Sequence, residues 1–595
     1  MPRSLKWTLI LGVLIALTVG VAACGGNDDE DSGDEQGTTQ GTPAEGQRGG
    51  KLQALWAGDV DFIDPGATYY QMGTQIIRAT QSTLYNPKVD DSTVAEPQLA
   101  DADPQISEDG CTVTVKIKDG VKFSPPVDRV VTSADVKYGI ERGFFETVNN
   151  GYAGAYFGPL RGAEVGVKPG TEIPGIETPD DTTVVFNLEP AEGEDKCPGG
   201  VLAGALQMPL AAPVPKDYAA EFDAKSPSAY GENQVSTGPY MIENDASGKA
   251  IGYEAGRRIH LVRNPNWDAA QDNRPAYLDE IDIQQGNDDA TVSSRQVLEG
   301  QGMISGDQVP PPAILKEALT QRKEQLILSP SGGGRWVAMN STVKPFDDLN
   351  VRKAVIAGFD RDAMRLTRGG EVVGKIPTHF IPPGMLGFDE AGGEQGPGVD
   401  FMSNPKGDME LAAQYFREAG FESGKYEGKE EILMVGENAG VDERAADVAA
   451  EQFRNLGFNV NLRKVTGDAM YTKFCNVPAQ KVAICPNVGW LKDFPDPQTF
   501  LDPTFNGDNI VPQNNSNWTQ LNDQALNDEM NAAKLLTDPA ERGQAWAEID
   551  KKITEMAPAV MWIWDDQPNI RSENVQGVID SDNALWSLAH TSIKQ

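Results

Sequence analysis

The chain has 595 residues, and its 88 aspartate and glutamate residues outnumber 51 lysine and arginine residues, for a formal net charge of −37. This balance argues against nucleic acid as a partner, because phosphates require a basic surface, and against a surface that lies on anionic lipid. It favours a solubilising surface outside the cell. The length exceeds that of one compact core and predicts two or three domains.

The N-terminal region predicts export and anchoring. Residues 1–23 join a basic start to an apolar run that is short for a membrane span, which is typical of a secretory signal peptide. Cys24 follows "VAA" and resembles the lipidated cysteine of bacterial lipoproteins, with an ordinary signal peptide as the alternative. Residues 24–50 contain no large apolar side chain, so we expect a disordered acidic tether.

Strands dominate the elements expected between residues 51 and 310. Thr132, with Asp135 three residues later, forms a capping-box signal for a helix start, and helical periodicity is also present in residues 74–85. Alternating apolar residues predict strands at 51–57, 111–117, 182–188, 258–264 and 280–286.

After residue 310, longer helices alternate with strands. The run 431–465 reads as strand, helix and strand, which indicates an α/β layer with parallel pairing. Residues 488–505, "VGWLKDFPDPQTFLDPTF", contain Pro495 and Pro497, so we predict a loop or a sheet edge there. We also expect helices at 350–364, 408–421 and 539–558, and strands at 335–340 and 559–566.

Four cysteines remain in the body of the chain. An even number in an exported protein favours disulfides, and three pairings are possible. Cys475 and Cys485 are near enough in sequence to close one local loop, which would leave Cys111 to pair with Cys197. A zinc site is a weak alternative, because there is no CxxC spacing and only three histidines are present. We therefore expect no metal.

Positive signals for catalysis are missing. Residues 369–375 have the spacing of a phosphate-binding loop, but Ile376 stands where serine or threonine would be needed. The sequence contains no nucleophile elbow and no HExxH helix. Adjacent acids such as 565–566 could flank a glycosidic bond, but such pairs more often belong to solvated loops. We expect neither an enzyme nor a cofactor.

An ordered set of segments resembles the extracellular solute-binding proteins of peptide-type ABC importers, family 5, which include oligopeptide, dipeptide and nickel receptors. The resemblance covers about residues 50–595, and extra residues before the helix in "FSPPVDRVVTSADV" are a departure from the family pattern. The segments are residues 95–142, "STGPYMI", "IHLVRNPNWD", "YLDEIDI", "FDDLNVRKAVIAGFDRDAM" and "GWLKDFPDPQTFL".

The resemblance implies an α/β, periplasmic-binding-protein-like fold of type II, with two lobes joined by a hinge and the extra inserted subdomain of cluster C. Lobe I would comprise residues 51–92, 213–306 and 566–595. The inserted subdomain would comprise residues 93–212, and lobe II would comprise residues 307–565. The change of pattern after residue 310 agrees with the last boundary.

The resemblance also implies a ligand site. In peptide-binding members the aspartate of a "GWxxD" motif meets the ligand's α-ammonium group, and by position this is Asp493, with Gly489 and Trp490 lining the cleft. A carboxylate suits this role, because an ammonium group removed from water needs a counter-charge and acceptors. Tyr69 and Tyr70 follow "DFIDPGA", where family members often reach the ligand.

Two further residues are candidates with weaker grounds. Trp564 lies near the inferred second hinge strand, and for it and Trp562 packing in the core is the alternative. Arg335 is a candidate partner for a ligand carboxylate.

The expected function is that of a monomeric, lipid-anchored receptor on the extracellular face of a bacterial cell membrane. It would capture short peptides between its lobes and deliver them to the transmembrane subunits of an ABC permease, with closure driven by differential affinity. The alternatives are an oligosaccharide or a nickel complex in the same receptor role, or an exported hydrolase.

Overall fold

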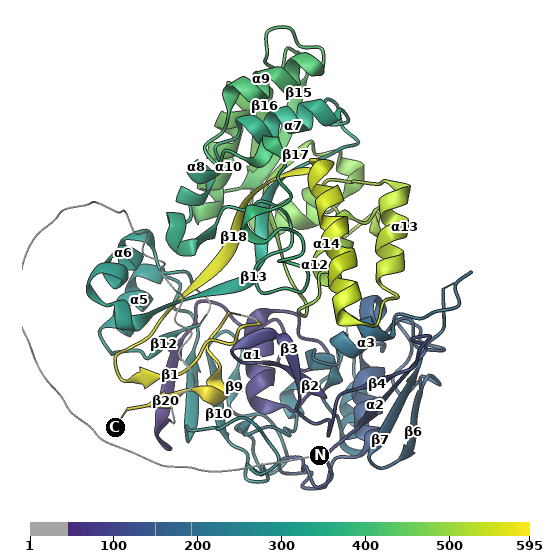
Figure 1. Cartoon of the computed structure of the whole chain (residues 1–595). Coiled ribbons are helices and arrows are strands. Elements are labelled where there is room, and N and C mark those ends of the chain that lie inside the picture. Colours follow the sequence, from purple (N-terminus) through teal and green to yellow (C-terminus); the bar gives the residue numbers. More distant parts are fainter. Residues whose placement is uncertain are drawn as a thin grey trace, which may run out of the picture. The chain divides into compact units, whose positions relative to one another are not determined.

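The computed structural model describes residues 46–594, apart from residues 149, 192, 307, 439 and 583 (Figure 1). The expected signal peptide, Cys24 and most of the acidic tether therefore lie outside the described residues. Within the described part, no helix combines the length and the apolar character that a membrane crossing requires.

The first of two six-stranded sheets has the order β12-β1-β11-β10-β8, with β9 paired to β10. β1 runs parallel to β11, whereas β10 is antiparallel to it. Alternate residues of these strands, such as Leu52 and Ile281, are fully buried in a core that includes Trp56 and Trp586. The strands are β1 (Lys51–Leu55), β8 (Tyr240–Ile242), β9 (Tyr253–Glu254), β10 (Arg258–Arg263), β11 (Glu280–Gln284) and β12 (Ile304–Ser305).

A separate four-stranded sheet, in the order β4-β5-β7-β6, has its own apolar core. The capping box expected at Thr132 and Asp135 opens α2, which contacts two of these strands. A disulfide joins Cys111 to Cys197. The elements are β4 (Gln105–Ile106), β5 (Thr112–Lys116), α2 (Ser133–Arg142), β6 (Ile176–Asp180), β7 (Thr183–Asn187) and α3 (Gly199–Ala205).

The second six-stranded sheet has the order β14-β18-β13-β17-β15-β16. The expected strand–helix–strand run is present as β15, α10 and β16, and the two strands pair in parallel. A second disulfide joins Cys475 to Cys485. The elements of this run and its neighbours are β13 (Leu326–Met339), β14 (Gly374–Lys375), β15 (Glu431–Glu437), α10 (Gly440–Asn455), β16 (Asn459–Val465), β17 (Ile484–Leu491) and β18 (Ala559–Ile570).

Helices and short strands complete the part of the chain that the structure describes. Aspartates cap several of the helices; Asp538, for example, accepts hydrogen bonds from the first backbone N–H groups of α14. These elements are α1 (Gln71–Thr80), β2 (Tyr85–Lys88), β3 (Asp91–Pro97), α4 (Lys216–Asp223), α5 (Ala290–Leu298), α6 (Pro312–Gln321), α7 (Leu349–Gly358), α8 (Arg361–Leu366), α9 (Met409–Glu418), α11 (Gly467–Ala469), α12 (Gln498–Phe505), α13 (Gln524–Ala533), α14 (Pro539–Glu555), β19 (Val575–Gln576) and β20 (Ser592–Ile593).

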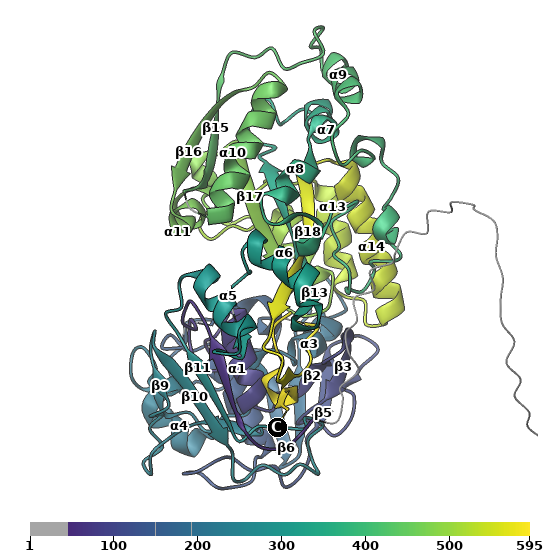
Figure 2. The ribbon, with the colours of Figure 1, turned by 90° about the vertical axis from the view of Figure 1, so that its left-hand side faces the viewer.

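Two long strands connect the sheets. β13 and β18 pair along most of their length, and Figure 1 shows them reaching from the second six-stranded sheet toward β12. Figure 2 shows the same two strands from the side. A β-bridge between Ile304 and Arg571 joins the end of β18 to the first sheet. We use lobe I for the first six-stranded sheet and the four-stranded sheet with their helices, and lobe II for the second six-stranded sheet with its helices. The residue boundaries proposed for the lobes stay predictions.

Two expectations from the sequence are wrong. The helix expected at 350–364 is broken, because Phe359 is extended and Asp360 caps a new helix, α8. The loop or edge expected at 488–505 is confined to the residues between β17 and α12, and β17 lies inside the sheet between β13 and β15. Pro497 precedes α12, where no helical hydrogen bond is lost, and only Pro503 lies within the helix.

Candidate functional site

A cavity of about 490 Å³ lies between the two lobes. This volume falls in the range of small-molecule sites, and aromatic side chains form much of the wall. Lobe I and the end of β18 contribute Tyr69, Tyr70, Gln71, Met72, Thr74, Arg78, Pro87, Tyr152, Gln207, Met208, Pro209, Gln567, Asp582 and Leu585, and lobe II contributes Tyr471, Asn476, Gly489, Trp490, Leu491, Lys492, Asp493, Phe494 and Trp518.

Asp493 lies on the cavity wall, two residues beyond the end of β17. Its carboxylate is half-buried and accepts a hydrogen bond from the Tyr156 hydroxyl of lobe I. Burial raises the pKa of Asp493 to about 7, and the charge of Asp582 adds to this, while the Tyr156 hydrogen bond opposes it. The salt bridges among the described residues do not include Asp493. The site therefore holds a carboxylate whose ionised form a bound cation would stabilise.

Trp490 forms part of the same wall, and a proline holds it there. Its indole N–H donates to the Thr499 carbonyl at 2.8 Å. That carbonyl would normally accept from the backbone N–H four residues later, but position 503 is proline and has no N–H. Trp518 packs edge-on against Trp490 with 6.1 Å between ring centroids. Because Pro503 has no N–H to donate, the Thr499 carbonyl accepts the hydrogen bond from the Trp490 indole, and this bond fixes the orientation of the ring.

Gly489 lines the cavity and also permits close approach of a neighbouring strand. A Cβ atom at this position would lie 3.0 Å from Arg335 Cγ and 3.1 Å from the Gly334 carbonyl oxygen. Arg335 is the residue of β13 that pairs with Gly489. The packing of β13 therefore provides one reason for glycine at this position, beside any approach of a ligand.

Tyr69 and Tyr70 both line the cavity and are 44% and 54% exposed. Asp61 positions them by accepting from their backbone N–H groups at 2.5 Å and 3.2 Å. The Tyr69 ring stacks on Tyr152 at 4.9 Å, and Tyr152 stacks in turn on Tyr156 at 6.1 Å. A row of aromatic rings thereby leads from the exposed Tyr69 to the carboxylate of Asp493.

Two of the expected ligand contacts do not line the cavity. Trp564 is only 2% exposed and packs against His379 and Phe388 in the core of lobe II. It lies in β18, an inner strand of the sheet, and consecutive residues 559–564 of this strand are all buried, so a side chain here is buried on either face. Arg335 is turned to Asp565, to which its Nε donates at 2.7 Å. The structure therefore places these two residues outside the cavity.

A group of four charged residues beside the cavity was not found from the sequence. Arg78 bridges Asp580 and Asp582, each at 2.5 Å, and Lys492 Nζ lies 3.7 Å from Asp582. Lys492 also donates to Ser92 Oγ at 3.0 Å, so a lobe II side chain is paired within lobe I. Burial lowers the pKa of Lys492, and Asp582 opposes that effect. These contacts join residues up to about 500 positions apart, and no local pattern signals them.

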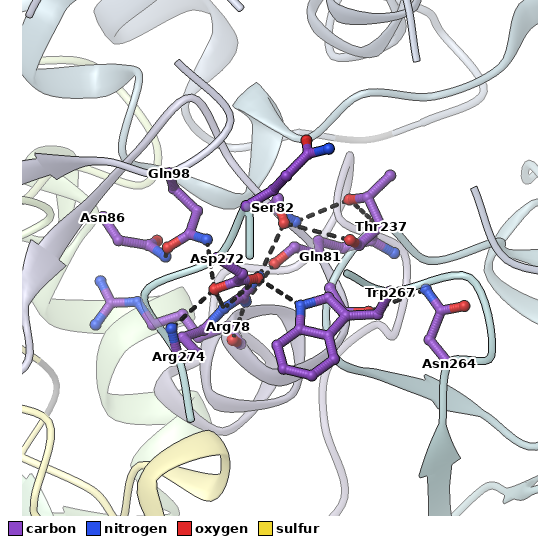
Figure 3. Close-up of polar contacts among 12 residues, drawn as sticks. Arg78, Gln81, Ser82, Asn86, Gln98, Thr237, Asn264, Trp267, Asp272 and Arg274 are labelled. Atoms are coloured by element: carbon purple, nitrogen blue, oxygen red, sulfur yellow. Dashed lines mark hydrogen bonds and ion pairs between the residues drawn. The ribbon is translucent and has the colours of Figure 1, made fainter. Parts of the chain in front are cut away.

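Arg78 is held in place by a buried polar network behind α1 (Figure 3). Arg274 donates to the carbonyl oxygens of Arg78 and Gln81, each at 2.7 Å, and to Ser82 Oγ at 2.8 Å. The Arg274 guanidinium is itself paired with Asp272 at 2.6 Å. The otherwise unpaired carbonyls at the end of α1 are thereby satisfied, which fixes the last turn and the side chain it presents to the cavity.

Phe494 is a third lobe II side chain that docks into lobe I. It is 2% exposed, belongs to the apolar core of the four-stranded sheet, and meets Tyr156 edge-on at 5.1 Å. A Cβ atom on Gly204 of α3 would lie 2.6 Å from its ring, so the glycine leaves room for Phe494. Gly200, one turn earlier, similarly faces the Leu536 carbonyl of lobe II. Lys492, Asp493 and Phe494 therefore form one continuous contact with lobe I, which we name the 492–494 contact.

Comparison with known proteins adds the family context. Residues 94–511 match the model described as bacterial extracellular solute-binding proteins, family 5 Middle. The oligopeptide-binding protein OppA of Bacillus subtilis (strain 168) is 24% identical, over 96% of this chain and 97% of its own length. Heme-binding protein A of Haemophilus influenzae is 24% identical over 82% of each chain. Among solved structures, clavulanic acid biosynthesis oligopeptide binding protein 2 aligns with a TM-score of 0.79 and 24% identity, over 92% of this chain and 96% of the other.

Proposed function

We propose that this chain, which belongs to the bacterial extracellular solute-binding proteins of family 5, captures short peptides in the cavity between its lobes. The peptide's ammonium group would bind Asp493, and Trp490, Gly489, Tyr69 and Tyr70 would form the surrounding wall. The family and the relatives compared above are binding proteins, and the proposal requires no covalent step.

The observation that carries the proposal is the burial of the Asp493 side chain and its effect on ionisation of the carboxylate. The side chain is half-buried on the wall of the cavity, and burial makes its ionisation less favourable than that of an ordinary aspartate, with the pKa raised to about 7. An ammonium group would supply the missing counter-charge and form charge-assisted hydrogen bonds. Exposed backbone beside an extended ligand would then bind peptide main chain largely without regard to its sequence.

Closure of the lobes would involve the 492–494 contact. Each of its three side chains meets lobe I through a different interaction, namely an ion pair, a hydrogen bond and apolar packing. In the proposed cycle these contacts break when the lobes open and reform when they close on a ligand. A ligand that bridges both walls would favour the closed form by its differential affinity.

Delivery and anchoring rest on the sequence and on the family. We propose that Cys24 carries a lipid, that residues 24–50 act as a tether, and that the closed receptor passes its ligand to an ABC permease. These roles would place the protein on the extracellular face of the cell membrane as a monomer.

An oligosaccharide is the second candidate ligand, because the aromatic side chains of the cavity would also stack on sugar rings. A nickel complex has less support: within the described residues, no cluster of three or more histidine, cysteine, aspartate and glutamate side chains is arranged to hold a metal ion.

The test is calorimetric titration of the purified protein with di-, tri- and tetrapeptides and with neutral oligosaccharides. We expect peptide binding in the wild type and a strong loss with Asp493→Asn, an isosteric change that removes the charge. If Asp493→Asn lost equal affinity for peptide and for sugar, or if the wild type bound sugar alone, the peptide assignment would be contradicted. Mass spectrometry of the peptide after incubation should show it intact, whereas cleavage would support the hydrolase alternative.

A further inference from the structure

We infer that the cavity selects ligands that bring a positive charge and no carboxylate into it, so that a peptide whose C-terminus is amidated or lies outside the cavity binds better than a short peptide with a free carboxylate inside. This inference deepens the proposed function and rests on it. It follows from the charged groups that the cavity offers.

The charged residues that line the cavity, within the described chain, are Arg78, Lys492, Asp493 and Asp582. Both cations are already paired. Arg78 contacts Asp580 and Asp582 through its two terminal nitrogens, and Lys492 lies beside Asp582. These two cations and two carboxylates together are electrically neutral. Of the four charged residues that line the cavity, Asp493 is therefore the one that has no partner of opposite charge among the described residues.

Recruiting Arg78 or Lys492 to a ligand carboxylate would be unfavourable. The side chains of Asp580 and Asp582 are 10% and 9% exposed, and that of Lys492 is 1% exposed. Removing a cation from them would leave carboxylates buried without compensation, which destabilises a protein more than the pair itself stabilises it. The Nε of Arg78 has no hydrogen-bond partner. A ligand carboxylate that reached this nitrogen would, however, be repelled by the carboxylates of Asp580 and Asp582, which already pair with the same guanidinium group.

A neutral amide meets no such obstacle. Asn476, Gln207 and Thr74 line the cavity with uncharged polar groups, and amide or hydroxyl groups can bond an amide without a counter-charge. The aromatic walls formed by Tyr69, Trp490 and their neighbours can also face a cation favourably. The cavity therefore supplies one anionic partner and neutral surroundings, which fits a ligand with a single positive charge.

The test compares trialanine with trialanine amide by calorimetry at pH 7.5. We expect the amide to bind at least about tenfold more tightly, because a carboxylate inside the cavity would be desolvated without a partner. Equal affinity, or tighter binding of the free acid, would overturn the inference while leaving the proposed function intact. If a folded protein binds neither tripeptide nor any other peptide, the proposed function itself fails.

The double variant Lys492→Met/Asp582→Asn, which removes both charges of this pair and leaves the net charge unchanged, provides a second measurement. The structure assigns Lys492 to Asp582 and not to the ligand, so the ratio of the two affinities should stay within about twofold of the wild-type ratio. A variant that loses affinity for trialanine alone would show that Lys492 binds the ligand carboxylate, and would overturn the inference. Circular dichroism confirms that the variant is folded before its affinities are compared.

Discussion

Phe494→Ala tests whether the 492–494 contact stabilises the closed form. The ring is 2% exposed and packs within the core of lobe I, although Phe494 belongs to lobe II. In an open form it would face water, so its burial contributes to closure and not to the folding of either lobe alone. Full burial of a phenylalanine side chain is worth about 1.5–3 kcal/mol.

The expected effect on ligand affinity follows from this value. If binding requires closure, destabilising the closed form by that amount weakens peptide binding by as much as roughly 10- to 100-fold, since about 1.4 kcal/mol corresponds to a factor of ten. The loss is smaller the more the ligand-free wild type is already closed. Calorimetry measures the affinity. Small-angle X-ray scattering measures the radius of gyration, which should be larger for ligand-free Phe494→Ala than for the wild type and should approach the wild-type value at saturating peptide.

Gly204→Ala is the matched perturbation on the other side of the contact. The added methyl group would lie 2.6 Å from the Phe494 ring, and α3 accepts alanine because no unusual backbone angle is required at this position. It should weaken binding in the wild type but have little effect in a Phe494→Ala background, since neighbouring substitutions are not additive when they act through one contact. Two results would show that Gly204 and Phe494 do not act through one contact that stabilises the closed form. The first is an equal loss of peptide affinity from Gly204→Ala in the wild type and in Phe494→Ala. The second is weaker peptide binding without a change in the radius of gyration.

Four further predictions concern the site and its scaffold. Because the pKa of Asp493 is about 7 in the ligand-free protein, its carboxylate becomes protonated below that pH, and peptide affinity should fall by about tenfold per pH unit between pH 6.5 and pH 5. A raised folded-state pKa also means that ionisation destabilises the ligand-free protein, increasingly from about pH 3.9 to pH 7. Asp493→Asn should therefore raise the melting temperature more at pH 8 than at pH 5. Pro503→Ala restores a backbone N–H that competes with Trp490 for its acceptor, so tryptophan fluorescence should shift and peptide affinity should fall a few-fold without loss of stability. Replacing Cys111 and Cys197 by serine should lower the unfolding free energy by about 2–5 kcal/mol, measured by denaturant titration, and leave peptide affinity unchanged in the folded fraction.

Each of these has an outcome that contradicts it. An equal change in melting temperature at pH 5 and pH 8 in Asp493→Asn would mean that ionisation of Asp493 does not destabilise the ligand-free protein. A pH-independent affinity would mean that Asp493 does not titrate in the measured range. Loss of affinity in Pro503→Ala with an unchanged fluorescence spectrum would place the effect elsewhere than Trp490. Weaker peptide binding by the folded double-serine variant would mean that this disulfide shapes the cavity.

Local structure was predictable where the signal is local. The capping pair Thr132 and Asp135 and the alternation in residues 51–57 depend on neighbours within a few positions. The helix is present as expected, and the strand is present over residues 51–55. The break at Phe359 was missed because the apolar pattern continues through it, while the cap on Asp360 interrupts the helix. The extent of β13 was also missed, since its first half takes its pairing from β18 and not from its own pattern.

The site was predictable only through its family motif. "GWLKD" directed attention to Gly489, Trp490 and Asp493, and all three line one cavity. The partners that define its charge and closure come from distant parts of the chain: Asp582 approaches Lys492 only in the folded protein, and Gly204 does the same for Phe494. Trp564 was proposed as a ligand contact because of its position near a hinge strand, but it is buried in the core of lobe II. Position along the chain does not show whether a side chain on an inner strand is exposed.

The most direct test of the central claim is to titrate the protein with one tripeptide in two forms, with a free N-terminus and with that N-terminus acetylated. Acetylation removes the positive charge and leaves the rest of the ligand unchanged. If Asp493 holds the ligand's ammonium group in the cavity, the acetylated form should bind at least about 100-fold more weakly to the wild type, since the bound ligand would enclose this half-buried carboxylate without a counter-charge. Asp493→Asn should reduce that difference to a few-fold. Equal binding of the two forms by the wild type would contradict the account.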